Sequence, residues 1–110
     1  MNKYVVWGCG FRGKNFLRYM GKERVVAFIE EDISKQGSVI EGIPVITKQE
    51  YIDKYVSYPV LITPFGVEDT IEKWLKEQQK HINATNSITP NIKKDLSDLN
   101  WLLDEGIITQ

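Results

Sequence analysis

Residues 4–13 read Tyr-Val-Val-Trp-Gly-Cys-Gly-Phe-Arg-Gly. The first four form a continuous apolar run, which predicts a strand buried on both faces, as in the centre of a parallel sheet. Gly8, Gly10 and Gly13 then match the pattern Gly-x-Gly-x-x-Gly. In that pattern the first glycine permits a tight turn, the second lets a phosphate approach the backbone, and the third lets a helix pack closely on the strand. The stretch therefore predicts a strand, a phosphate-holding loop and a helix.

Apolar runs and amphipathic segments alternate along the first 90 residues. Strands are predicted at 25–29, 43–46 and 59–63, with a possible fifth at 84–88, and the internal proline of 43–46 favours a sheet edge. Helical spacing or capping predicts helices between the first two strands, after Thr47 and after Pro64. The sequence predicts an α/β fold: a Rossmann-like open parallel sheet of four to five strands with helices on both faces.

The chain divides into a Rossmann-like nucleotide-binding domain at 1–90 and a C-terminal tail at 91–110. Apolar residues recur at helical intervals from Ile92 to Leu103, after Pro90 and before Gly106, with no strand expected after them. We expect a helical tail that either packs on the sheet or mediates association, including homo-oligomers.

Composition excludes several classes of protein. The 110 residues carry 14 basic and 15 acidic side chains, a formal net charge of −1, which leaves no positive field for a nucleic acid. One cysteine and one histidine exclude a disulfide scaffold and a usual zinc site, so no metal is expected. No apolar run approaches the ~20 residues of a membrane span, and none resembles a signal peptide. A cytoplasmic domain without a membrane span is expected.

Acidic residues follow the second predicted strand. Glu30 stands about 20 residues after the glycine loop, where the dinucleotide fingerprint places a carboxylate that accepts hydrogen bonds from a ribose. Glu31 and Asp32 extend this negative charge, which disfavours a ligand with a 2′-phosphate although Lys35 is near. An alternative interpretation is a solvated acidic turn, which suits Asp32 best.

The loop after the strand at 59–63 should face the glycine loop across the sheet. Thr63 could donate to a ligand oxygen, and Phe65 could cover a base or sugar. Cys9 is interpreted as a small buried filler more readily than as a reactive thiol. The candidate ligand-binding residues are Gly8, Cys9, Gly10, Phe11, Arg12, Gly13, Glu30, Glu31, Lys35, Thr63, Pro64 and Phe65.

Catalytic motifs are missing from the sequence. There is no Tyr-x-x-x-Lys pair, and neither Gly13-Lys14 nor Gly21-Lys22 is followed by the Ser or Thr of a P-loop. We therefore expect a module that binds a small-molecule nucleotide, either a nucleotide-sugar or NAD(H), without catalysing a reaction alone. The alternative is a structural, oligomerisation or partner-docking domain that has the fold without a ligand.

Four segments carry a family resemblance: 7–14, 26–32, 34–37 and 41–45. They resemble the small Rossmann-type N-terminal or accessory domain of bacterial surface-polysaccharide biosynthesis proteins. Such domains occur in sugar acetyltransferases of the sialic-acid and pilin-glycosylation type and in nucleotide-sugar dehydratases. The resemblance implies a bound UDP-sugar, with the glycine loop near phosphate and the acids near the uridine or ribose. It also implies a larger parent enzyme, such as an acetyltransferase, dehydratase or glycosyltransferase.

Overall fold

The computed structural model describes residues 3–64, 66–83 and 92–94, and it has a mixed α/β architecture. Strands β1 (Tyr4–Trp7), β2 (Val25–Ile29), β4 (Ile43–Ile46) and β5 (Val60–Ile62) confirm the four predicted strands. Two short strands, β3 (Val39–Ile40) and β6 (Ile92–Lys94), complete a sheet of order β3-β4-β2-β1-β5-β6. Every neighbouring pair is parallel except β3 and β4, which are antiparallel.

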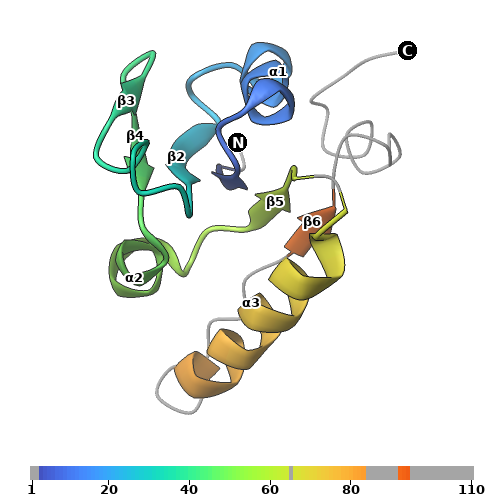
Figure 1. Ribbon diagram of the computed structural model, residues 1–110. Helices are drawn as coiled ribbons and strands as arrows, with labels where there is room; N and C mark the ends of the chain where they lie inside the picture. The colour runs from blue at the N-terminus through green and yellow to red at the C-terminus, as the bar shows by residue number, and fades with distance from the viewer. Residues whose placement is uncertain (1–2, 65, 84–91, 95–110) are drawn as a thin grey trace.

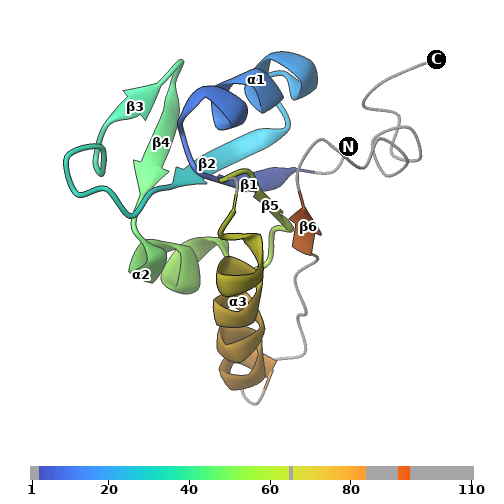
Figure 2. The same cartoon turned by 45° about the vertical axis from the view of Figure 1, so that its right-hand side comes forward.

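The helices lie on both faces of the sheet (Figures 1 and 2). Helix α1 (Phe11–Met20) covers one face, and α2 (Lys48–Glu50) with α3 (Glu68–Asn83) covers the other. The π-helix η1 (Tyr51–Tyr55) continues α2 directly. The predicted capping box that starts α2 is present: Thr47 Oγ1 accepts from the Glu50 amide at 3.1 Å, and Glu50 Oε1 accepts from the Thr47 amide at 3.3 Å.

Alternation along the strands divides the core into two clusters. Successive side chains of a strand point to opposite faces, so Tyr4 and Val6 pack towards α1 whereas Val5 and Trp7 pack towards α3. The α1 cluster includes Phe16 from the helix itself. On the opposite face the cluster takes residues from the strands, η1 and α3: Val5, Trp7, Ala27, Ile29, Ile46, Tyr51, Val60, Ile62, Ile71 and Leu75. Both faces of the central strands are buried, as their continuous apolar runs predicted.

Two predictions along the chain need correction or limitation. The helix predicted from Pro90 is wrong at Ile92–Lys94, because these residues form β6 and pair in parallel with Val60–Ile62 of β5. Hydrogen bonding to an open sheet edge outweighs the helical spacing of the apolar residues there. The possible strand at 84–88 and the rest of the predicted tail lie outside the described residues.

The proline of β4 stands one strand in from the sheet edge. Pro44 pairs in register with Val39 of the two-residue strand β3, which is the edge itself. Only Val45 and Ile46 of β4 pair with β2, so the missing proline amide interrupts no ladder on that side. Within the described ranges, none of the helices has the length and apolar character that crossing a membrane requires.

Candidate functional site

A pocket of about 360 Å³ opens at the carboxyl ends of β1, β2 and β5. It brings together ten of the twelve predicted ligand-binding residues: Gly8, Gly10, Phe11, Arg12, Gly13, Glu30, Glu31, Lys35, Thr63 and Pro64. Cys9 lies behind this wall and is not part of the lining, and Phe65 lies outside the described residues. The structure thus brings ten of the twelve predicted residues together around one pocket.

Two glycines of the loop are required by close packing. Gly8 has φ +97°, and a Cβ on it would lie 2.7 Å from Thr63 Oγ1 and 3.1 Å from Pro64 Cγ. A Cβ on Gly13 would overlap the Gly8 carbonyl oxygen, which is backbone and cannot move aside cheaply. The first and third glycines thus do what the motif predicted: one turns the chain out of β1, and the other lets α1 approach that turn.

Gly10 differs from both, because open space surrounds it. It is the N-cap of α1 with φ −78°, and a Cβ built on it would meet no atom within 4 Å. No side chain caps this end of the helix, and the first turn contains no acidic residue. Since amides in the first turn of a helix lack intrahelical acceptors and carry the positive end of the helix dipole, this corner of the pocket favours an anion.

The side chains around the pocket carry charges of both signs. Arg12 and Lys35 supply positive charge, while Glu30 and Glu31 supply negative charge from the end of β2. In the described ranges, no group of three or more His, Cys, Asp or Glu side chains is arranged to hold a metal ion.

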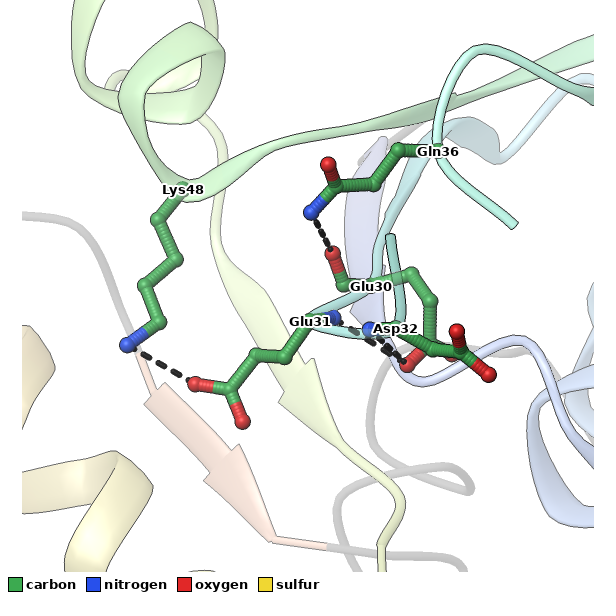
Figure 3. Close-up of polar contacts among 5 residues, drawn as sticks. All are labelled: Glu30, Glu31, Asp32, Gln36 and Lys48. Atoms are coloured by element: carbon green, nitrogen blue, oxygen red, sulfur yellow. Dashed lines mark hydrogen bonds and ion pairs between the residues drawn. The ribbon is translucent and has the colours of Figure 1, made fainter. Parts of the chain in front are cut away.

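The Glu30 carboxylate accepts four hydrogen bonds from neighbouring residues. Its Oε2 accepts hydrogen bonds from the Cys9 amide at 3.3 Å and from Cys9 Sγ at 3.2 Å. Its Oε1 accepts from the Glu31 and Asp32 amides, both at 3.1 Å (Figure 3). Burial alone would raise the pKa of Glu30, but these hydrogen bonds and nearby Lys35 hold that pKa below its ordinary value. Glu30 therefore ties the glycine loop to the turn after β2.

Cys9 donates two of these hydrogen bonds to Glu30, one from its amide and one from its thiol. Its side chain is only 4% exposed and belongs to the α1 core cluster. Burial, the hydrogen bond to Glu30 and the negative charge of Glu30 raise the pKa of the Cys9 thiol, outweighing Lys35 and Lys14. This environment suits the interpretation of Cys9 as a buried filler, because a reactive cysteine needs an accessible thiolate.

Glu31 makes a different set of contacts from Glu30. Its Oε1 lies 2.7 Å from Lys48 Nζ, at the first residue of α2 (Figure 3). The same ammonium group lies 5.0 Å from the ring centroid of Trp74 and 6.0 Å from that of Trp7. The two indole rings pack edge to face at 5.5 Å. One acid, one lysine and two tryptophans thus form a connected cluster, and two of its members, Trp7 and Glu31, line the pocket.

Thr63 has a structural contact in place of the predicted ligand contact. Its hydroxyl donates to the Trp7 carbonyl at 2.6 Å, and the residue is 3% exposed. Because a hydroxyl has one hydrogen to donate, the predicted donation from Thr63 to a ligand is not available in this arrangement. The bond instead holds the loop after β5 against the end of β1.

Sequence reasoning missed three residues that line the pocket: Trp7, Val67 and Ile71. The continuous apolar run indicated a buried Trp7 and helical spacing a buried Ile71, and both residues are almost fully buried. Val67 is 45% exposed just before α3 begins, and its place in the loop after the strand at 59–63 could have indicated a pocket residue. These side chains add apolar surface to a pocket that charged residues also line.

Comparison with known proteins corrects the predicted family. No curated protein matches the chain. A family model described as "C2185-like, N-terminal" matches residues 1–83. The match overturns the predicted membership among N-terminal domains of sugar acetyltransferases and nucleotide-sugar dehydratases, because the segments that suggested it all fall within the matched range. With 83 of its 110 residues matched, the chain belongs to the C2185-like N-terminal family.

Proposed function

We propose that this domain binds a nucleotide containing a diphosphate, either NAD(H) or a nucleotide-sugar, in the pocket at the end of β1, and that it does not catalyse a reaction alone. The observation that carries the proposal is Gly10. It is an uncapped helix N-terminus with open space where a Cβ would stand, in a loop whose other two glycines are fixed by packing. That combination leaves room for a phosphate against backbone amides.

Strand order supports a Rossmann-like interpretation of the fold. The five parallel strands, numbered along the chain, lie in the order third, second, first, fourth and fifth, since β3 is antiparallel. This is the order of the doubly wound nucleotide-binding sheet, in which ligands bind where the order reverses, beside the first strand. In this sheet the reversal falls between β1 and β5, and the pocket lies at their carboxyl ends.

The charge and size of the pocket suit part of a nucleotide. Arg12 and Lys35 offer positive charge near the N-terminus of α1, and Val67 and Ile71 offer apolar surface from the other side. Pockets that enclose small ligands usually measure about 300–1,000 Å³, and 360 Å³ lies at the lower end of that range. The lone cysteine donates to Glu30, so its thiol is committed to a structural bond.

Calorimetric titration tests the proposal directly. The full chain is titrated with NAD, NADH, UDP and UDP-glucose up to millimolar concentration, and we expect saturable binding of at least one of them. Gly10→Val should weaken that binding by at least tenfold with little change in melting temperature, and Gly10→Ala should have a smaller effect on binding. Thr70→Val, an exposed position on α3 outside the pocket, serves as the control. Titrations without heat for all four compounds would refute the proposed function.

A further inference from the structure

We infer that Glu31, and not Glu30, is the carboxylate that accepts hydrogen bonds from the hydroxyl groups of the ligand. The inference rests on the proposed function and makes it more specific, because it assigns the recognition of a ribose diol to one side chain. A carboxylate recognises a diol by accepting one or two O–H bonds, and it can do so only with oxygens that protein donors have not already filled.

The oxygens of Glu30 have no such capacity left. A carboxylate has about four acceptor sites, two on each oxygen. Cys9 fills two sites on Oε2, and the Glu31 and Asp32 amides fill two on Oε1. A ribose bound to Glu30 would have to displace donors that already bond to its oxygens, and each lost hydrogen bond would cost free energy.

Glu31 has the capacity that Glu30 lacks. Its side chain is 57% exposed and lines the pocket, and its one ionic contact in the described part of the chain is Oε1 with Lys48. Figure 3 shows the Glu30 and Glu31 side chains extending in different directions, with Glu31 reaching towards Lys48. Because the lysine contacts Oε1, the carboxylate can accept a ligand hydroxyl at Oε2 while it keeps the lysine.

The contacts of the two neighbours show how they differ. Glu30 follows the last residue of β2 and contacts Cys9, which packs in the α1 cluster. Glu31 contacts Lys48, whose ammonium lies near Trp7 and Trp74 on the α3 face. Both residues line the pocket, but the oxygens of Glu30 already accept hydrogen bonds from the protein.

Lys48 holds the Glu31 carboxylate in position. The lysine is the first residue of α2, a position fixed by the capping box between Thr47 and Glu50. Its ammonium lies within about 6 Å of both indole rings, a distance at which a cation is attracted to an aromatic face. The carboxylate is thus oriented before a ligand arrives, which reduces the entropy lost on binding.

The test compares ADP with 2′-deoxy-ADP, and UDP with 2′-deoxy-UDP, by calorimetric titration of the full chain and its variants. Wild-type protein should bind the ribonucleotide of a pair roughly tenfold more tightly, the value of one hydrogen bond to a charged acceptor. Glu31→Gln should reduce this ratio towards one without lowering the melting temperature of the ligand-free protein. Asp32→Asn, which removes the same charge from the same turn but outside the pocket lining, should keep the ratio. Glu30→Gln should lower the melting temperature of the ligand-free protein.

The outcomes separate this inference from the proposed function. If no nucleotide binds wild-type protein, the proposed function fails and the inference fails with it. If nucleotides bind but the preference for ribose is absent, or persists in Glu31→Gln, the inference alone is overturned. A Glu30→Gln variant that melts like wild type would also overturn it, because the Glu30 carboxylate would then not be committed to its loop.

Discussion

Gly13→Ala gives the sharpest test of how the glycine loop is built. An added Cβ would overlap the Gly8 carbonyl oxygen, so α1 must move away from the end of β1. Overpacking typically costs about 1–3 kcal/mol, and a rigid backbone obstacle places this case near 3. Alanine is favoured over glycine in a helix by at most about 1 kcal/mol, which leaves a net loss of about 2 kcal/mol. For a chain of this length that loss lowers the melting temperature by about 8 °C.

The assay is thermal and urea unfolding of the ligand-free protein, with Gly10→Ala as the matched control. The same substitution three residues earlier meets open space, so its cost is the loss of a good N-cap residue, less than about 1 kcal/mol. The two alanine variants should therefore differ clearly in stability although both lie in the same loop. If Gly13→Ala is as stable as Gly10→Ala, the close approach of α1 to Gly8 is refuted.

Two further predictions concern the link between Glu30 and Cys9. The pKa of Glu30 is lowered in the folded protein, so its contribution to stability is present above its ordinary pKa of 4.5 and is lost as pH falls through the folded pKa. The urea midpoint should therefore fall more between pH 6 and pH 3 in wild type than in Glu30→Gln. Equal pH dependence in the two proteins would count against the hydrogen bonds at Glu30. The raised pKa of Cys9 predicts that iodoacetamide at pH 8 alkylates the folded protein more slowly than the urea-unfolded chain, and equal rates would show that the thiol is neither buried nor held protonated.

Much of the fold could be predicted because local signals and tertiary demands agree in the first 83 residues. The apolar run at Tyr4–Trp7 needs burial on both faces, and the sheet provides it by placing β1 between β2 and β5. Gly13 is required by a contact with Gly8 only five residues away, so the spacing within the motif already contains the geometry. Structural features that depend on residues close together in the sequence can therefore be predicted from the sequence pattern.

The failed predictions involve contacts between distant segments. Ile92–Lys94 has helical spacing, yet it pairs with β5 about thirty residues earlier, and no local pattern records that a sheet edge is available. The pairing of Lys48 with Glu31, about which the sequence made no prediction, also depends on β4 lying beside β2. The family prediction failed for a related reason: a glycine loop and an acid after the second strand satisfy the geometry of one turn, and that geometry is shared by chains of different families.

The positions of the two glutamates in the candidate site depend on the register of β2 in the sheet. The fingerprint asks for an acid about 20 residues after the glycine loop, and both Glu30 and Glu31 satisfy it in sequence. In the structure Glu30 contacts Cys9, whereas Glu31 contacts Lys48, which lies near the tryptophans. A shift of β2 by one residue would move one glutamate into the place of the other, but it would also turn Ile29 away from the core cluster that it shares with Trp7. The burial of Ile29 fixes the register of β2 and thereby places Glu30 beside Cys9 and Glu31 beside Lys48.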